Sequence, residues 1–189
     1  KPDIVIHLAA KVGGIQDNIK YPANYFDDNI LINTNIVKVC KEYDVKRFIG
    51  ILSTCIYPSV VDNYPMTEED LFIGPPPPSN FSYGYAKRCL AVQIDAYNKQ
   101  FGTKYNYLIP CNLYGDYDNL HNENKMHFIT ALLNKIRNSK DNSLHLLGTG
   151  KPLRQFMYAG DLAKIIKLVI ENNITESFNV APDFNYSID

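Results

Sequence analysis

The chain has 189 residues, of which 46% are hydrophobic and 21% charged, as is typical of a soluble globular domain. Its formal net charge of −1 gives no electrostatic reason to expect nucleic acid or an anionic membrane as a partner. No apolar run approaches the roughly 20 residues that a membrane-spanning helix needs. The four cysteines, at positions 40, 55, 89 and 111, form no CxxC pair. We therefore expect them to be reduced thiols in an intracellular, cytoplasmic protein.

Segments of strand character alternate with segments of helical period along the chain. The first half predicts a strand at 4–8, a helix at 22–43, a strand at 47–52 and, after a proline-rich loop, a helix at 83–101. The second half predicts a strand at 105–109, a helix at 127–139, a strand at 144–147, a helix at 161–171 and a strand at 177–181. This alternation favours an α/β fold in which helices cover both faces of a parallel, Rossmann-like sheet.

The apolar spacing predicts which side of each long helix is buried. For the first long helix these residues are Phe26, Ile30, Asn33, Val37 and Cys40. For the second they are Ala86, Leu90, Ile94, Tyr97 and Phe101, with Gly102 ending the helix.

Ligands of an open α/β sheet bind beyond the carboxyl ends of its strands. The segments to consider are therefore those that follow the strands, at 7–14, 53–58, 110–119 and 154–161. The stretch 114–152 is rich in Asn, His and charged residues, which favours a substrate-facing insertion.

A tyrosine and a lysine four residues apart open the second long helix. Tyr83 and Lys87 share one helix face, and a nearby ammonium lowers the pKa of a phenol. A phenol tuned in this way exchanges protons with a carbonyl or alcohol oxygen. Ser53 follows a predicted strand, and its hydroxyl could bond to the same oxygen. The spacing alone is a weak signal, and by itself it favours a packed tyrosine beside a solvated lysine. Ser53 could likewise only satisfy backbone groups at the strand end.

These residues resemble the Ser–Tyr–Lys set of the short-chain dehydrogenases, and further motifs resemble the GDP-L-fucose synthase branch of the extended members. The matching segments run in order through nearly the whole chain: HLAAKVGGI at 7–15, CIYP at 55–58, PCNLYG at 110–115, DNLH at 118–121 and GTGKPLRQF at 148–156.

The resemblance implies roles for individual residues. Ser53, Tyr83 and Lys87 match the residues of a reduction step, and Cys55 and His127 match the pair assigned to two epimerisations, with His121 second to His127. The coenzyme would contact Leu8, Ala9, Ala10, Ser53, Tyr83, Lys87, Pro110, Asn112 and Leu113. The substrate would contact Lys11, Gly13, Asn112, His127, Lys135 and Arg154.

The implied reaction is the NADPH-dependent 3,5-epimerisation and 4-reduction of GDP-4-keto-6-deoxy-D-mannose. A thiol and an imidazole suit the epimerisations, since both groups titrate near working pH. Three parts are implied: a partial NAD(P)-binding domain at 1–113, a substrate-binding segment at 114–160, and a returning helix and strand at 161–189. By the same resemblance, a homodimer would form through helices 22–43 and 83–101.

Four positions depart from the usual pattern of that branch. Thr54 replaces a serine, Cys111 a threonine, Lys135 an arginine and Leu147 an aromatic residue. Lys135 offers a point charge where an arginine would make a bidentate contact with phosphate. These changes leave the catalytic residues intact, but they weaken the assignment of the sugar nucleotide.

Other interpretations remain open. A related nucleotide-sugar dehydratase, 4-epimerase or colitose-type synthase shares the fold, although the run Ser53-Thr54-Cys55 differs from the dehydratase set. A catalytically inactive Rossmann-type binding subunit belongs to another class, and five intact catalytic positions argue against it. His121 and His127 could suggest a metal, but no third ligand stands in register, so we expect none.

The sequence contains neither GxGxxG nor GxxGxxG, and only Gly13-Gly14 are adjacent among its ten glycines. The resemblance places the phosphate-binding turn upstream of Lys1, in roughly 60 further residues. We therefore expect that both ends are cut, and that the 189-residue chain alone binds coenzyme poorly and turns over nothing. Titration of NADPH fluorescence checks this expectation, and tight binding by the isolated chain would contradict it.

Overall fold

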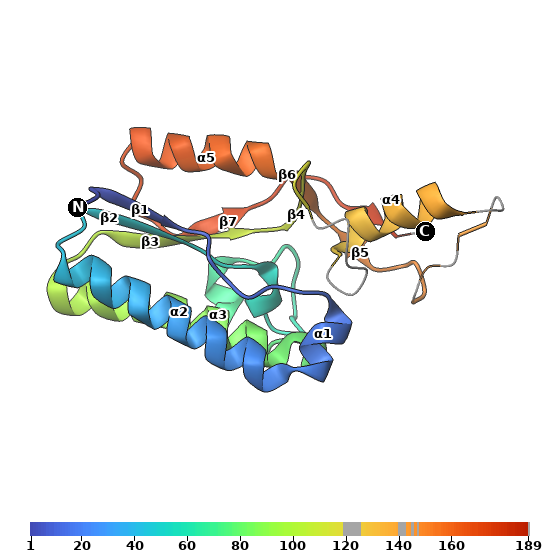
Figure 1. Cartoon of the computed structure of the whole chain (residues 1–189), viewed down its shortest axis with the longest axis horizontal. Coiled ribbons are helices and arrows are strands. Elements are labelled where there is room, and N and C mark those ends of the chain that lie inside the picture. The colour runs from blue at the N-terminus through green and yellow to red at the C-terminus, as the bar shows by residue number, and fades with distance from the viewer. Residues whose placement is uncertain (119–125, 140–142, 145, 147, 189) are drawn as a thin grey trace.

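The computed structural model describes residues 1–118, 126–139, 143–144, 146 and 148–188. Its centre is a four-stranded parallel sheet in the order β1-β2-β3-β7, which confirms the predicted fold class. These strands are β1 (Ile4–His7), β2 (Arg47–Ile51), β3 (Tyr105–Pro110) and β7 (Phe178–Val180). The helices α2 (Pro22–Glu42) and α3 (Phe81–Phe101) cover one face, and α5 (Ala159–Glu171) covers the other (Figure 1).

The remaining elements are short and lie mostly beyond the carboxyl ends of the sheet (Figure 1). They are α1 (Ile15–Lys20), the 3₁₀ turns η1 (Thr54–Ile56), η2 (Glu68–Phe72) and η3 (Pro78–Asn80), β4 (Asn112–Tyr114), α4 (Phe128–Asn138), β5 (Leu153–Arg154), β6 (Phe156–Tyr158) and β8 (Tyr186–Ser187). Strand β4 pairs with β6 in parallel, and β5 pairs with β8 antiparallel. The division into three domains predicted from the sequence stays a prediction.

Alternation along the strands creates two cores, one on each face of the sheet. Phe48 packs in the core under α2 and α3, whereas its neighbour Ile49 packs in the core under α5. Because successive strand side chains point to opposite faces, one buried strand supplies both layers. All five residues of β2 are buried, as expected for a central parallel strand.

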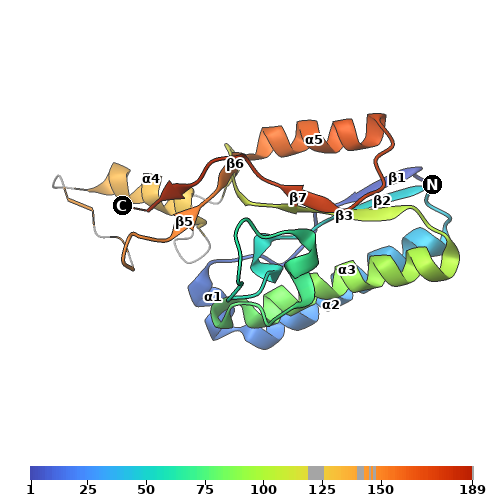
Figure 2. The ribbon, with the colours of Figure 1, turned by 180° about the vertical axis from the view of Figure 1, so that it is seen from behind.

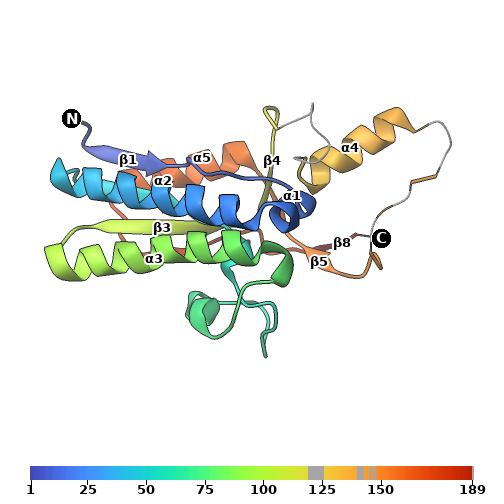
Figure 3. The same ribbon diagram turned by 60° about the horizontal axis from the view of Figure 1, so that its bottom comes forward.

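The two long helices begin and end close to their predicted positions. Helix α3 ends at Gly102, whose positive φ of 64° is a left-handed cap that glycine adopts without steric cost. Figure 3 shows α2 and α3 lying side by side along the sheet. Phe101 was predicted to be buried, but it is 45% exposed in the last turn of the helix.

The predicted buried face of α2 was wrong in its first half. Tyr25 and Asn29 face inward in place of Phe26, which is 38% exposed, and Ile30, which is only partly buried. The amide of Asn29 bonds to the loop after β1, and that of Asn33 bonds to the buried imidazole of His7 at 2.9 Å. Tertiary hydrogen bonds thus hold Asn29 and Asn33 on the inward face of α2. The periodicity of apolar residues cannot reveal such buried polar positions.

Other predictions differ from the structure in smaller ways. The strand expected at 144–147 lies partly outside the described residues, and Leu144 and Leu146 belong to no strand. Helix α1 and the two-stranded pairs were not predicted, since elements of two to six residues carry too little periodicity. No helix in the described ranges is long and apolar enough to cross a membrane.

Candidate active site

The parallel register brings the ends of β1, β2 and β3 to one edge of the sheet. His7 lies opposite Gly50, and Ile51 lies opposite Leu108. The segment 52–80 between β2 and α3 leaves this edge and folds back beneath β7 (Figure 2). It is tied there by Tyr57, whose hydroxyl donates to Asn179 of β7 at 2.8 Å. Side chains from three strand ends can therefore converge.

Ser53 and Tyr83, predicted to act on one oxygen, lie together. Ser53 follows β2 directly, and its hydroxyl accepts a 3.4 Å hydrogen bond from the backbone N–H of Cys55. A side-chain hydrogen bond also joins Ser53 to Tyr83 in the first turn of α3. Two hydroxyl groups from different elements are thus available to a single ligand oxygen.

Lys87 is the buried member of this group. Its side chain is only 3% exposed, and its ammonium donates to the carbonyl of Ile51 at the end of β2, at 2.8 Å. Burial lowers the pKa of Lys87 to about 8, because an ammonium is poorly solvated there. An ammonium has three N–H donors, so this bond leaves two for a ligand.

The expected acidification of Tyr83 by Lys87 was wrong for this geometry. Burial raises the pKa of Tyr83 well above its ordinary value, and the electrostatic influence of the neighbouring Cys55 raises it further. The bond from Ser53 acts in the opposite direction but is smaller. Tyr83 is therefore held as a neutral phenol, a form that can donate a proton.

Cys55 lies against the first turn of α3, where a glycine permits close approach. A Cβ atom added at Gly84 would lie 2.8 Å from the Cys55 carbonyl oxygen and 2.7 Å from Cβ of Pro76. The thiol itself accepts a hydrogen bond from Asn80, with 3.3 Å between Nδ2 and Sγ. The structure therefore brings Cys55 to Tyr83 and adds Asn80, a residue that sequence reasoning missed.

The segment after β1 borders the same cluster through α2. Leu8 and Ala9 are exposed, while Asn29 accepts from the N–H of Lys11 and donates to its carbonyl, both at 3.0 Å. The Lys11 ammonium pairs with Asp28 at 2.6 Å. Tyr25 then contacts the ring of Tyr83 edge-on, with 6.5 Å between centroids.

A second group of predicted residues lies on the elements beyond the sheet. His127 precedes α4 and is 3.3 Å from Asp118, whose other carboxylate oxygen accepts from Thr130. Arg154 on β5 is exposed and donates to the carbonyl of Leu153 at 2.8 Å, and Lys135 is exposed on α4. Among the described residues, no hydrogen bond or ion pair joins this group to Tyr83 or Cys55. His121 and Leu147 lie outside the described residues.

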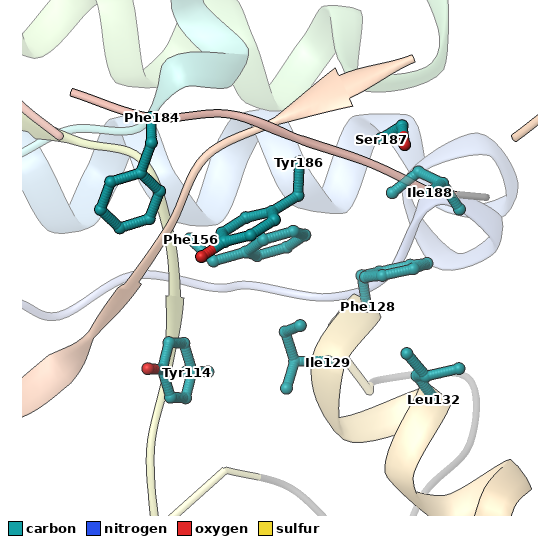
Figure 4. Close-up of a pocket in the computed structure, with 9 residues that line it drawn as sticks. All are labelled: Tyr114, Phe128, Ile129, Leu132, Phe156, Phe184, Tyr186, Ser187 and Ile188. Atoms are coloured by element: carbon teal, nitrogen blue, oxygen red, sulfur yellow. The ribbon is translucent and has the colours of Figure 1, made fainter. Parts of the chain in front are cut away.

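A cavity of about 370 Å³ lies within this second group (Figure 4). Its wall is largely aromatic, formed by Tyr114, Phe128, Ile129, Leu132, Phe156, Phe184, Tyr186, Ser187 and Ile188. Phe128 and Phe156 stack with their ring planes 20° apart. Phe128 follows His127 in sequence, and Phe156 lies two residues after Arg154. A planar, aromatic ligand group suits such a wall.

The remaining predicted contacts occupy the end of β3 and the start of β4. Pro110 is buried, Leu113 is partly buried, and the Asn112 side chain donates to the carbonyl of Gln155 at 3.0 Å. Gly13 lies against the hydroxyl of Tyr25, with no room for a Cβ. No cluster of metal-binding side chains occurs within the described part of the chain.

Burial of Lys87 predicts a pH-dependent stability. The unfolded chain holds the proton up to the ordinary pKa of 10.5, whereas the folded chain loses it near 8. Between these values the unfolded state binds more protons, so the wild type gains stability as the pH rises. We expect the free energy of unfolding of the wild type, relative to that of Lys87→Met, to rise by about 3 kcal/mol between pH 7 and pH 10.5. Urea unfolding measures this difference.

Lys99→Met on the same helix is the matched control, because Lys99 is exposed. The difference in unfolding free energy between Lys99→Met and the wild type should change little over the same pH range. If the difference in unfolding free energy between Lys87→Met and the wild type stays constant with pH, Lys87 is not a buried lysine that releases its proton near pH 8.

Comparisons with known proteins show the family to which the chain belongs. Residues 1–181 match the NAD dependent epimerase/dehydratase family. GDP-L-fucose synthase of Dictyostelium discoideum is 46% identical over 176 residues, which cover 91% of this chain and 54% of that protein. The probable GDP-L-fucose synthase of Drosophila melanogaster is 38% identical over 181 residues, covering 91% of this chain and 56% of that protein.

Among solved structures, a GDP-L-fucose synthetase from Naegleria fowleri bound to NADP superposes with a TM-score of 0.84 at 36% identity. That match covers 96% of this chain and 60% of the Naegleria chain. The chain spans about half the length of the curated relatives it matches. The resemblance found in the motifs is thus confirmed, and the chain belongs to the NAD dependent epimerase/dehydratase family.

Proposed function

We propose that the protein containing this chain converts GDP-4-keto-6-deoxy-D-mannose to GDP-L-fucose, by 3,5-epimerisation and NADPH-dependent 4-reduction. The observation that carries the proposal is the grouping of Ser53, Cys55, Tyr83 and Lys87 where β2 meets α3. It combines a proton-donating phenol with a thiol, which a plain reductase does not need. The relatives from Dictyostelium and Drosophila are named for this activity.

The epimerisations require removal of a proton beside the C4 ketone. In our proposal the Cys55 thiolate takes a C–H proton, and the electron pair of that bond moves to the ketone oxygen. Tyr83 and Ser53 donate hydrogen bonds to the resulting enolate oxygen. A proton from His127 reaches the opposite face of the carbon and inverts it. The bound substrate would have to bring Cys55 and His127 to the two faces of one sugar.

NADPH, when bound, supplies the hydride that reduces C4. Tyr83 gives its phenolic proton to the C4 oxygen, a role that suits a phenol whose pKa is raised by burial. Lys87 has donors to spare for the ribose hydroxyls of a coenzyme, and the exposed Leu8 and Ala9 leave the edge beside β1 open to it. The described residues therefore fit the nicotinamide end of NADPH, with Ala10, Pro110, Asn112 and Leu113 as further contacts. The similar GDP-L-fucose synthetase from Naegleria fowleri binds NADP.

The aromatic cavity is the proposed seat of the guanine base. Stacked aromatic rings favour a flat heterocycle, and the cationic Arg154 and Lys135 lie on elements that flank the cavity. Arginine suits a diphosphate because its planar guanidinium can bond to two oxygens at once. Lys11, Gly13, Asn112 and His127 complete the proposed substrate contacts.

A colitose-type synthase is the second candidate. GDP-L-colitose synthase of Yersinia pseudotuberculosis is 32% identical over 194 residues, covering 100% of this chain and 62% of that protein. A colitose-type substrate would use the same Cys55 and Tyr83 with a sugar lacking one more hydroxyl group. Assay of both GDP-4-keto sugars side by side separates the two candidates.

Turnover by the full-length protein tests the proposed activity. We expect NADPH consumption with GDP-4-keto-6-deoxy-D-mannose, and a loss of at least 100-fold in Tyr83→Phe, since general acid catalysis is worth about 10²–10⁴-fold. Cys55→Ser should still reduce the ketone but yield a sugar that is not epimerised. If the wild type is inert with this substrate, the fucose assignment falls, and other nucleotide 4-keto sugars should be tried.

We also propose that the protein works in the reducing cytoplasm, where four free cysteines are stable.

We further propose that two copies of the protein pair through α2 and α3. Exposed apolar side chains on the outer face of these helices support the pairing: Leu31 is 58% exposed and Val92 is 53% exposed. We expect Leu31→Asp to shift a dimer to monomer in light-scattering chromatography. Leu168→Asp on α5 is the control, with similar exposure on the opposite face. A wild type that stays monomeric at high concentration would remove the proposal.

A further inference from the structure

Asn80 stands where a helix cap is expected, but its side chain bonds elsewhere. It occupies the N-cap position of α3, at which asparagine ordinarily accepts a hydrogen bond from the N–H two or three residues on. Here the side chain makes no such bond. Its Nδ2 instead donates to Sγ of Cys55 at 3.3 Å. A local interaction that stabilises helices is thus replaced by a contact with the proposed acid–base thiol.

Several other contacts besides that of Asn80 hold the segment around Cys55 in place. The buried guanidinium of Arg88 donates to the carbonyl of Ile56, the residue after Cys55, and to the carbonyl of Gly74 at 2.8 Å. The N–H of Cys55 donates to Ser53, and Gly84 lets its carbonyl oxygen pack on α3. Since the backbone of Cys55 is held, the distance from Asn80 to Sγ is set by the fold.

The direction of the bond decides its chemical effect. Asn80 donates an N–H, and a donor stabilises a thiolate more than a thiol. The charged or ionisable groups around the thiol, among the described contacts, are Tyr83 and Arg88 on α3 and, one ring further away, Tyr25 on α2. Among the described contacts, Arg88 donates to the carbonyls of Ile56 and Gly74, and the hydrogen bond to Sγ comes from Asn80.

We propose that Asn80 is a positioning residue for the epimerisation, which fixes the Cys55 thiol and stabilises its thiolate by donating to Sγ. This proposal rests on the proposed function for its catalytic meaning. In the step it serves, the thiolate accepts a C–H proton and becomes a thiol, while the electron pair passes to the ketone oxygen held by Tyr83. Asn80 then holds Sγ in the position from which it takes the proton.

The reactivity of the thiol tests the bond without any activity assay. In a Cys89→Ser background, Cys55 is the one thiol outside the core, because Cys40 and Cys111 are 1% and 5% exposed. The rate of iodoacetamide alkylation of Cys55 is measured from pH 6 to pH 10 on the whole chain, by mass spectrometry of the peptide. Thermal melts of every variant establish that it is folded.

We expect Asn80→Ala to move the midpoint of this pH profile upward by about 0.7 pH unit, a roughly five-fold smaller thiolate fraction below the midpoint. Asn80→Asp has the same shape and keeps a good cap, so it covers the case in which the alanine variant does not fold. Its carboxylate should move the midpoint further upward. Ser79→Ala, in the same turn, is the matched control and should leave it unchanged.

In the full-length protein, Asn80→Ala should slow the exchange of the C3 and C5 protons with deuterated solvent more than it slows hydride transfer to an already epimerised ketone. Unchanged midpoints in both Asn80 variants would overturn the proposal, whatever the protein's substrate. Shifted midpoints in a protein that does not act on the GDP-sugar would support the hydrogen bond and leave only the proposed function refuted.

Discussion

The site depends on the packing of α3 against the carboxyl end of β2, an interface called the seam below. One side of this seam is a buried parallel strand, and the other is a helix whose first two turns carry Tyr83, Gly84, Lys87 and Arg88. Lys87 bonds to the last carbonyl of the strand, and Arg88 bonds to the carbonyl of Ile56 in the turn that follows. The buried carbonyls of Ile51 and Ile56 need hydrogen-bond donors, and these two cationic side chains of the helix supply them. The same bonds fix the serine and cysteine that the strand delivers.

Burial between α3 and β2 shifts the pKa values of Lys87 and Tyr83 in opposite directions. The pKa of Lys87 falls and that of Tyr83 rises, because a poorly hydrated site disfavours both the ammonium and the phenolate. Each group is thus moved toward its neutral form. A neutral phenol is the form that gives a proton to a developing alkoxide, so the raised value supports the donor role and not that of a standing base.

Much of this arrangement could be predicted from the sequence. The order of strands and helices follows from periodicity, and the spacing of Tyr83 and Lys87 places them on one face of a helix. The inward face of α2 could not be predicted, because Asn29 is buried by its bonds to Lys11, which lies 18 residues away. Asn80 and Arg88 were missed for the same reason, since their partners are set by tertiary packing. A polar residue at an inward helical position is the one local signal that could have pointed to Asn29.

The separation between the two groups of site residues places a demand on the ligand. Tyr83 lies on α3 and Cys55 lies in η1, next to the carboxyl end of β2, whereas His127, Arg154 and the aromatic cavity belong to elements beyond the sheet. The proposed substrate has one end for each group, with its aromatic base assigned to the cavity and its keto sugar to Tyr83. Binding energy gained at the distant base can then hold the sugar between Cys55 and His127, which is the alignment that epimerisation requires.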